Sequence, residues 1–181
     1  ATSNICTAQV LLSVMAGMYA VYHGKDGLIK IATKIATLTQ LLENGISSLD
    51  YNQENENFFD TLKIKVSSED KNKIKKLAEK NHLNFRYFET DHIGISLDET
   101  TQVSNVLDIL NIFSEVSGKS LEINLNNIDD LNHNISGNQI RNSEFLSHEV
   151  FNKYHTEHEI LRYMKRLENK DLSLVHSMIS L

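Results

Sequence analysis

Three histidines near the C-terminal end of the sequence are residues that could bind a metal ion. His148, His155 and His158 lie close together, and His155 and His158 are three residues apart, so a helix would carry both on one face. Imidazole is a common zinc ligand, yet the set lacks the ligand spacing of known zinc sites. Because acidic residues beside them also suit a solvated helix start, we favour that interpretation and predict no metal site.

The single cysteine is the other reactive candidate. Cys6 would lie in the first turn of a helix that begins at Ser3 or Asn4, where the helix dipole favours a thiolate and therefore a redox role. We favour the alternative of a buried, inert cysteine, because its neighbours look buried. One cysteine excludes an internal disulfide framework and suits a reducing compartment.

A charge-free segment opens the sequence. Residues 1–24 contain no Asp, Glu, Lys or Arg, and their apolar run is too short and too polar at its start for a membrane span. We therefore expect a helix that a larger protein surrounds on every side, with Thr2, Ser3 and Asn4 at its start and Gly24 at its end.

The composition allows a folded core, but no motif in the sequence forms a complete active site. Apolar residues make up 40% of the sequence, while a net charge of −6 argues against nucleic-acid binding. No nucleophile elbow, glycine-rich dinucleotide loop or carboxylate pair stands out. The segment "SGKS" is not a phosphate loop, because Phe113 stands where that motif needs glycine.

Hydrophobic periodicity predicts the elements that would hold these residues. Apolar residues every three or four positions predict a helix over 26–44, ended by Gly45, and alternating residues predict a strand within 58–66. A capped helix from Ser67, a hairpin over 83–97 and a helix within 98–118 follow, and Thr156 caps a last helix to Lys170. The middle is therefore a β-α-β-β-α unit of α+β class, with its helices on one face of a sheet.

Long segments carry a family resemblance. "ATSNICTAQVLLSVMAGMYAVYHG", "FRYFETDHIGISLDET" and "RNSEFLSHEVFNKYHTEHEILRYMKRLENKDLSLVHSMI" resemble the decarboxylating glycine dehydrogenase family, the P-protein of the glycine cleavage system. The resemblance implies an internal fragment of a type I pyridoxal-phosphate enzyme that has two homologous halves. Residues 1–24 would be a buried connecting helix, 25–118 the small α/β domain of the non-catalytic half, 119–145 an irregular linker, and 146–181 the bridge into the catalytic half.

The resemblance also implies a function for the longer protein. That enzyme would use pyridoxal phosphate to decarboxylate glycine and pass its aminomethyl group to the lipoyl arm of the H-protein, working as a dimer in the cytoplasm or in the mitochondrial matrix. The cofactor lysine would lie outside this chain, so we expect the fragment itself to be structural and to bind no cofactor. The alternative is a stand-alone interaction or regulatory module without a catalytic parent.

Few site residues carry over from the family. Thr2, Ser3 and Asn4 match a family segment whose backbone N–H groups could contact an anion. The bridge motif is matched by His155, Glu157, Glu159, Arg162 and Tyr163. Arg162 could hold a carboxylate across the interface between the two halves. The alternative for all of these residues is a structural helix cap or an interface ion pair, and we favour it because polar residues at a helix start are usually caps.

Overall fold

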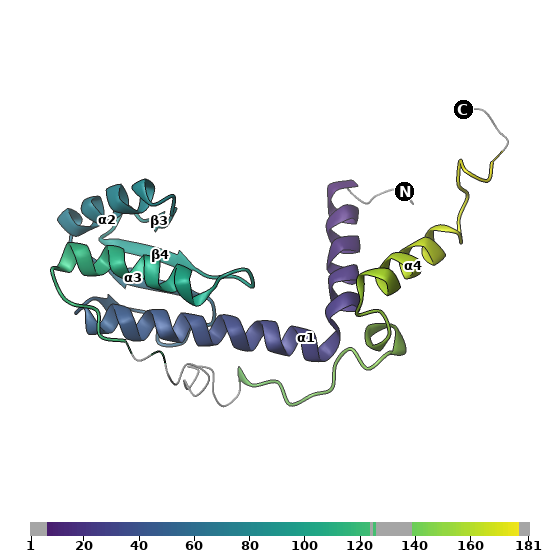
Figure 1. Cartoon of the computed structure of the whole chain (residues 1–181), viewed down its shortest axis with the longest axis horizontal. Helices are drawn as coiled ribbons and strands as arrows, with labels where there is room; N and C mark the ends of the chain where they lie inside the picture. Colours follow the sequence, from purple (N-terminus) through teal and green to yellow (C-terminus); the bar gives the residue numbers. More distant parts are fainter. Residues whose placement is uncertain (1–6, 124, 126–138, 178–181) are drawn as a thin grey trace. The chain divides into compact units, whose positions relative to one another are not determined.

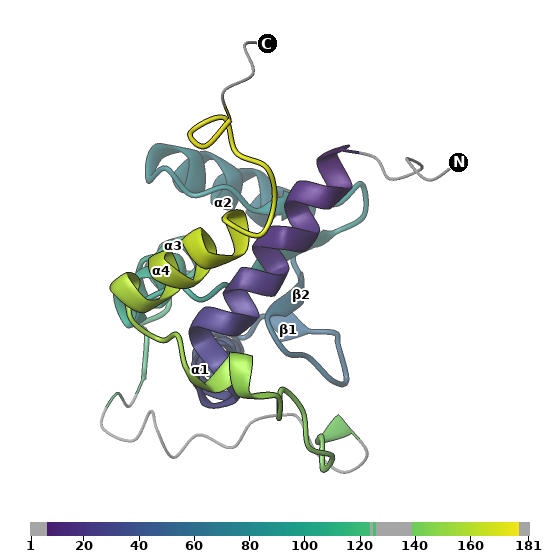
Figure 2. The same ribbon diagram turned by 90° about the vertical axis from the view of Figure 1, so that its right-hand side faces the viewer.

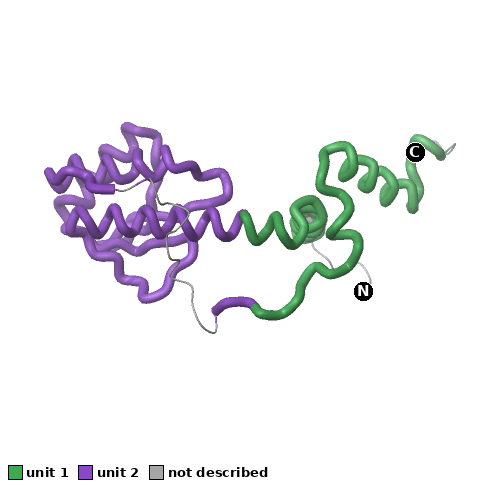
Figure 3. The backbone as a smooth tube through the Cα atoms, turned by 60° about the horizontal axis from the view of Figure 1, so that its bottom comes forward, with its two compact units in different colours: residues 1–30, 142–181 green, residues 31–141 purple. Residues whose placement is uncertain are grey.

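The structure is a computed structural model that describes residues 7–123, 125 and 139–177. Its contacts divide the chain into two compact units (Figure 3). We call residues 31–141 the sheet unit, and residues 1–30 together with 142–181 the helical unit. Four residues named above, Thr2, Ser3, Asn4 and Cys6, lie outside the described part of the chain.

Helices and short strands alternate along the chain (Figure 1). In chain order they are α1 (Thr7–Ser48), β1 (Asn52–Gln53), β2 (Thr61–Lys65), α2 (Ser68–Lys80), β3 (Arg86–Tyr87), β4 (His92–Ser96), α3 (Val103–Ser117), the 3-10 helix η3 (Glu149–Asn152) and α4 (Glu157–Glu168). The predicted β-α-β-β-α order and α+β class are confirmed. Strand β1 was not predicted from the sequence.

The sheet is antiparallel throughout and has the strand order β1-β2-β4-β3. Leu62 pairs with Ile95 and Ile64 with Ile93, so the apolar residues of the two central strands share one face. All four are buried, whereas Lys63 points to the other face and is only half-buried. Period-two alternation therefore produces one covered and one open face, as expected for an antiparallel sheet.

One hydrophobic core fills the sheet unit. The fully enclosed side chains come from α1, from the covered face of the sheet, and from α2 and α3; they include Leu42, Ile46, Leu62, Ile64, Ile74, Ile93, Leu110 and Phe113. Phe113 also meets Tyr51 edge to face, with ring centroids 5.2 Å apart. Every member of this core cluster belongs to the sheet unit, which therefore buries its own apolar residues.

Two glycines in α1 have different structural roles. Gly24 has φ 62° and ψ −173°, a conformation that only glycine adopts readily, and it breaks the helix as predicted. The prediction that Gly45 ends the second helix was wrong, because α1 continues to Ser48. A Cβ atom on Gly45 would lie 2.6 Å from the methyl carbons of Leu110. Gly45 is therefore needed for the close approach of α3 rather than for a helix end.

Side-chain caps fix the starts of two predicted helices. Ser67 Oγ accepts a hydrogen bond from the backbone N–H of Asp70 at 3.0 Å and caps α2. Thr156 and Glu159 form a reciprocal capping box at the start of α4. Both caps were predicted from the sequence and are confirmed. Among the described residues, no helix has the length and apolar character that a membrane crossing requires.

Candidate functional site

The first half of α1 presents an apolar surface that the described chain leaves uncovered. Five neighbouring side chains are largely exposed: Val10 at 41%, Leu11 at 62%, Leu12 at 63%, Val14 at 52% and Met15 at 59%. We call this set the α1 apolar face. Contiguous exposed apolar residues mark interaction surfaces. By contrast, Val21, closer to the helix break, is 4% exposed.

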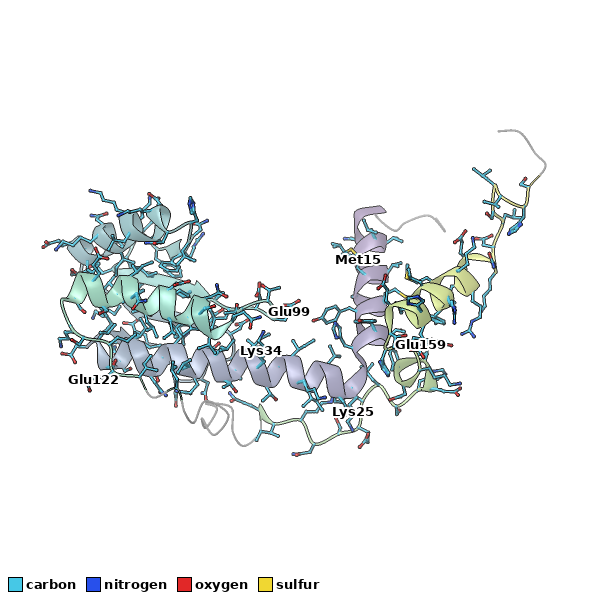
Figure 4. All side chains as sticks on the ribbon, viewed as in Figure 1. Met15, Lys25, Lys34, Glu99, Glu122 and Glu159 are labelled. Carbon is cyan, nitrogen blue, oxygen red and sulfur yellow. The ribbon has the colours of Figure 1, made fainter. Side chains whose placement is uncertain are left out.

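A groove continues this apolar character where α4 lies beside the first half of α1 (Figure 2). Its volume is about 490 Å³, and it is lined by Met15, Met18, Tyr19, Tyr22, Glu157 and Ile160. Figure 4 shows Met15 on α1 and Glu159 on the neighbouring helix. The spacing of Met15, Met18, Tyr19 and Tyr22 places all four on one helix face, which explains how a single helix can line the groove.

The helix break at Gly24 is closed by the segment that precedes α4. His155 Nδ1 donates a hydrogen bond to the backbone carbonyl oxygen of Tyr22 at 2.8 Å. A Cβ atom on Gly24 would lie 2.6 Å from the carbonyl oxygen of Phe151 and 2.8 Å from His155 Cε1. His155 therefore satisfies a carbonyl group that the broken helix leaves free, which is a structural role.

The Glu159 carboxylate is part of the N-terminal cap of α4. Its carboxylate accepts hydrogen bonds from Thr156 Oγ1 at 2.9 Å and from the Thr156 backbone N–H at 3.1 Å. These bonds, the side-chain bond first, lower the pKa of the Glu159 carboxyl. Glu159 is therefore an anion whose acceptor capacity serves the cap.

A second pocket lies on α4 and contains two stacked aromatic rings. The rings of Tyr154 and Tyr163 are 4.3 Å apart with an interplanar angle of 14°. Arg166 Nη2 donates to the Tyr154 hydroxyl at 2.7 Å, and its guanidinium carbon is 5.6 Å and 5.2 Å from the centroids of the Tyr154 and Tyr163 rings. We call this the two-tyrosine pocket; its volume is about 310 Å³, and it is lined by Lys153, Tyr154, Glu159, Arg162, Tyr163 and Arg166.

The five described residues that were carried over from the bridge motif lie in three places. Glu159, Arg162 and Tyr163 line the two-tyrosine pocket, Glu157 lines the groove beside α1, and His155 binds the helix break. Tyr154 and Arg166 were not among the residues predicted from the sequence. The spacing of Tyr163 and Arg166, three residues apart on a helix, was a signal for the second of these, whereas Tyr154 precedes the helix and gave none.

The three clustered histidines do not share a site in the structure. His148 Nδ1 accepts a hydrogen bond from the backbone N–H of Val150 at 3.1 Å, while His155 bonds to Tyr22. Among the described residues, no group of three His, Cys, Asp or Glu side chains is assembled to hold a metal ion.

A pyridoxal-phosphate site would need a lysine whose amine is free to bond to the cofactor. Lys71 is the most enclosed of the ion-paired lysines, at 17% exposure, but its Nζ donates to the carbonyl oxygens of Phe88 and Thr90, at 3.2 Å and 2.7 Å. Burial raises the pKa of the Tyr51 phenol to about 12, so this side chain stays protonated and belongs to the core. The Lys71 amine is engaged by backbone carbonyl groups and is therefore not free to bond to the cofactor.

Comparison with known proteins agrees with the resemblance seen in the sequence. The family model of the glycine cleavage system P-protein matches residues 1–113. Over the whole chain, the sequence is 46% identical to glycine dehydrogenase (decarboxylating) of Bacteroides fragilis and 48% identical to that of Flavobacterium johnsoniae. It is also 46% identical to the human protein named glycine dehydrogenase (decarboxylating), mitochondrial.

The matched region is a small part of each relative. The chain covers 19% of the Bacteroides fragilis protein and 18% of the Flavobacterium johnsoniae and human proteins. Identity near one-half along the entire chain, together with the family match over residues 1–113, identifies the family. The chain belongs to the P-protein family of the glycine cleavage system.

Proposed function

We propose that the chain is a structural part of a glycine-decarboxylating P-protein. That longer protein releases carbon dioxide from glycine and transfers the aminomethyl group to the lipoyl arm of the H-protein. The observation that carries this proposal is the 46–48% identity over the whole chain to relatives named glycine dehydrogenase (decarboxylating).

Within that protein, the chain contributes packing surface rather than chemistry. The α1 apolar face supports this role, because five large apolar side chains at 41–63% exposure are covered in a stable assembly. Their coverage by other parts of the P-protein polypeptide explains why residues 1–24 carry no ionic side chain. Under the alternative, a stand-alone module, these apolar side chains would remain in contact with water.

Pyridoxal phosphate, which the family resemblance implies, supplies an electron sink for carbon–carbon bond cleavage at glycine. Because Lys71, the most enclosed of the ion-paired lysines, donates to backbone carbonyl groups, we propose that residues elsewhere in the longer protein hold the cofactor. Purified chain mixed with pyridoxal phosphate is expected to show the absorbance of the free cofactor alone. A new absorbance band that saturates at one cofactor per chain, and that borohydride reduction converts into an adduct on a single lysine, would contradict this expectation.

The assembly and the compartment are also part of the proposal. We propose that the longer protein works as a dimer with a lipoylated H-protein as its partner. A bacterial cytoplasm is the compartment we favour. The mitochondrial matrix is the alternative, and the human relative is named as a mitochondrial protein.

The test compares the longer protein with the chain alone. Full-length P-protein that carries this segment is supplied with glycine labelled at its carboxyl carbon and with lipoylated H-protein, and released carbon dioxide is counted. We expect release from the full-length protein, and none from the chain alone or when H-protein is omitted. Release of label by the chain alone would overturn the structural role, and a full-length protein inactive with its cofactor and H-protein would overturn the activity.

A further inference from the structure

The two-tyrosine pocket contains more positive than negative charge. Lys153, Arg162 and Arg166 are its cations, and Glu159 is the single acid among its lining residues. Lys153 forms an ion pair with Glu149 outside this set, and Glu159 is the acceptor in the helix cap. Within the described part of the chain, neither arginine forms a salt bridge with a carboxylate.

The two arginines line the same pocket and belong to the same helix. Arg162 and Arg166 are four residues apart on α4, so their side chains leave the helix on one face. Arg166 is held in place, since it donates to Tyr154 at 2.7 Å and contacts both tyrosine rings. That hydrogen bond uses one of the five N–H donors of a guanidinium, so further donors stay available for a planar anion such as a carboxylate.

The surroundings indicate an occupant that belongs to a protein rather than a small molecule. Both arginines are exposed, whereas sites for small molecules enclose most of the ligand surface. Tyrosine and arginine are enriched at the energetic centres of protein interfaces. In addition, the matched relatives are about five times as long as this chain, which covers 18–19% of them.

We propose that a carboxylate side chain from a part of the P-protein polypeptide outside this chain docks between Arg162 and Arg166. This inference rests on the proposed function, because it takes the occupant from the longer P-protein. The stacked tyrosines position Arg166. Arg162, whose side chain has no hydrogen bond or ion pair among the described residues, supplies the second set of donors.

The experiment uses full-length P-protein with the photo-cross-linking residue p-benzoylphenylalanine in place of Lys153 at the rim of the pocket. We expect irradiation to join this position to a peptide of the same polypeptide that contains Asp or Glu. Arg162→Gln is expected to lower the cross-link yield roughly tenfold, the effect of losing one charged hydrogen bond, while Arg162→Lys retains part of it. Lys165→Gln is the matched control, because it removes the same charge from α4 outside the pocket.

Three outcomes would overturn the inference. The first is a cross-link to a second copy of the protein, and the second is a cross-link yield that Arg162→Gln leaves unchanged. The third is the absence of a cross-link together with saturable, Arg162-dependent binding of inorganic phosphate to the chain, which is measured by tyrosine fluorescence. The glycine assay separates this inference from the proposed function. Glycine decarboxylation without the expected cross-link rejects the pocket assignment alone, whereas the cross-link without decarboxylation rejects the activity alone.

Discussion

The sheet unit buries its apolar residues, whereas the helical unit leaves many of its apolar residues exposed. In the sheet unit, apolar residues of α1, α2, α3 and the sheet close around one core. In the helical unit, the α1 apolar face stays exposed, and α4 has no buried residue. The difference teaches that apolar content alone does not produce a core: the sheet unit has helices that cover its apolar face, whereas the described part of the helical unit leaves its apolar face exposed.

The largest expected effect compares the same kind of truncation in the two units. Phe113→Ala in the core is expected to lower the free energy of unfolding by about 3–5 kcal/mol, because it removes a fully buried ring. Leu12→Ala on the α1 apolar face is expected to change it by less than about 0.5 kcal/mol. Urea denaturation followed by circular dichroism measures both. Equal losses for the two variants would mean that the α1 face is covered within the chain.

The second comparison uses two glycines of α1. Gly45→Ala is expected to cost about 1–3 kcal/mol, because the new methyl group would overlap Leu110. Gly17→Ala meets no atom within 4 Å, so it is expected to stabilise the helix by about 0.5–1 kcal/mol. Thermal unfolding of both variants measures these two changes in stability. A neutral Gly45→Ala variant would show that α3 can move away from α1.

The third comparison removes one cap from each unit. Ser67→Ala and Thr156→Ala each remove a helix cap, a change typically worth about 1 kcal/mol. Because Ile74 and Ala78 anchor α2 in the core, Ser67→Ala is expected to lower the stability of the whole sheet unit. Because α4 lacks buried residues, Thr156→Ala is expected to fray α4 alone. Hydrogen exchange, read residue by residue, distinguishes local from global opening.

The smallest expected effect is a pH dependence in each unit. The pKa of the Glu54 carboxyl is lowered, first by the hydrogen bond from Lys63 and then by His92, and the pKa of Glu159 is lowered by its bonds to Thr156. A carboxyl whose pKa is lower in the folded state adds stability above its unfolded pKa, and that stability disappears as the pH falls through the lowered value. Melting temperatures recorded from pH 7 down to acid should therefore fall less for Glu54→Gln than for the unchanged chain.

The two carboxylates are expected to respond differently to salt. Glu54 is held by a cation, with Lys63 Nζ 3.0 Å away, so high salt is expected to weaken its contribution. Glu159 is held by a neutral hydroxyl and by a backbone N–H group, so its contribution to the helicity of α4 should change less. The same decrease at high salt for both carboxylates would reject this distinction.

Local signals predicted much of the fold. The caps at Ser67 and Thr156 and the alternation around Leu62 and Ile64 predicted elements that the structure contains, because each depends on neighbours in sequence. Strand β1 was missed, since its two residues become a strand by pairing with Ile64 and Lys65 of β2. The continuation of α1 past Gly45 likewise depends on Leu110, which is distant in the sequence.

The candidate site was predicted in part for the same reason. Glu159, Arg162 and Tyr163 belong to one recognisable motif, and they line one pocket. The stacking of Tyr154 on Tyr163 depends on the path of the chain before α4, which no local pattern in the sequence encodes. Residues 1–6, which held four of the named candidates, lie outside the described structure.

The hydrogen bond between His155 and Tyr22 has a consequence for synthesis on the ribosome. The two residues are 133 positions apart, and at typical elongation rates the ribosome needs roughly ten seconds to add the second after the first. During that interval the bend at Gly24 lacks the hydrogen bond from His155, while the apolar helix before it has already left the exit tunnel. A chaperone that recognises short apolar segments therefore has a target on the nascent chain before the bend can close.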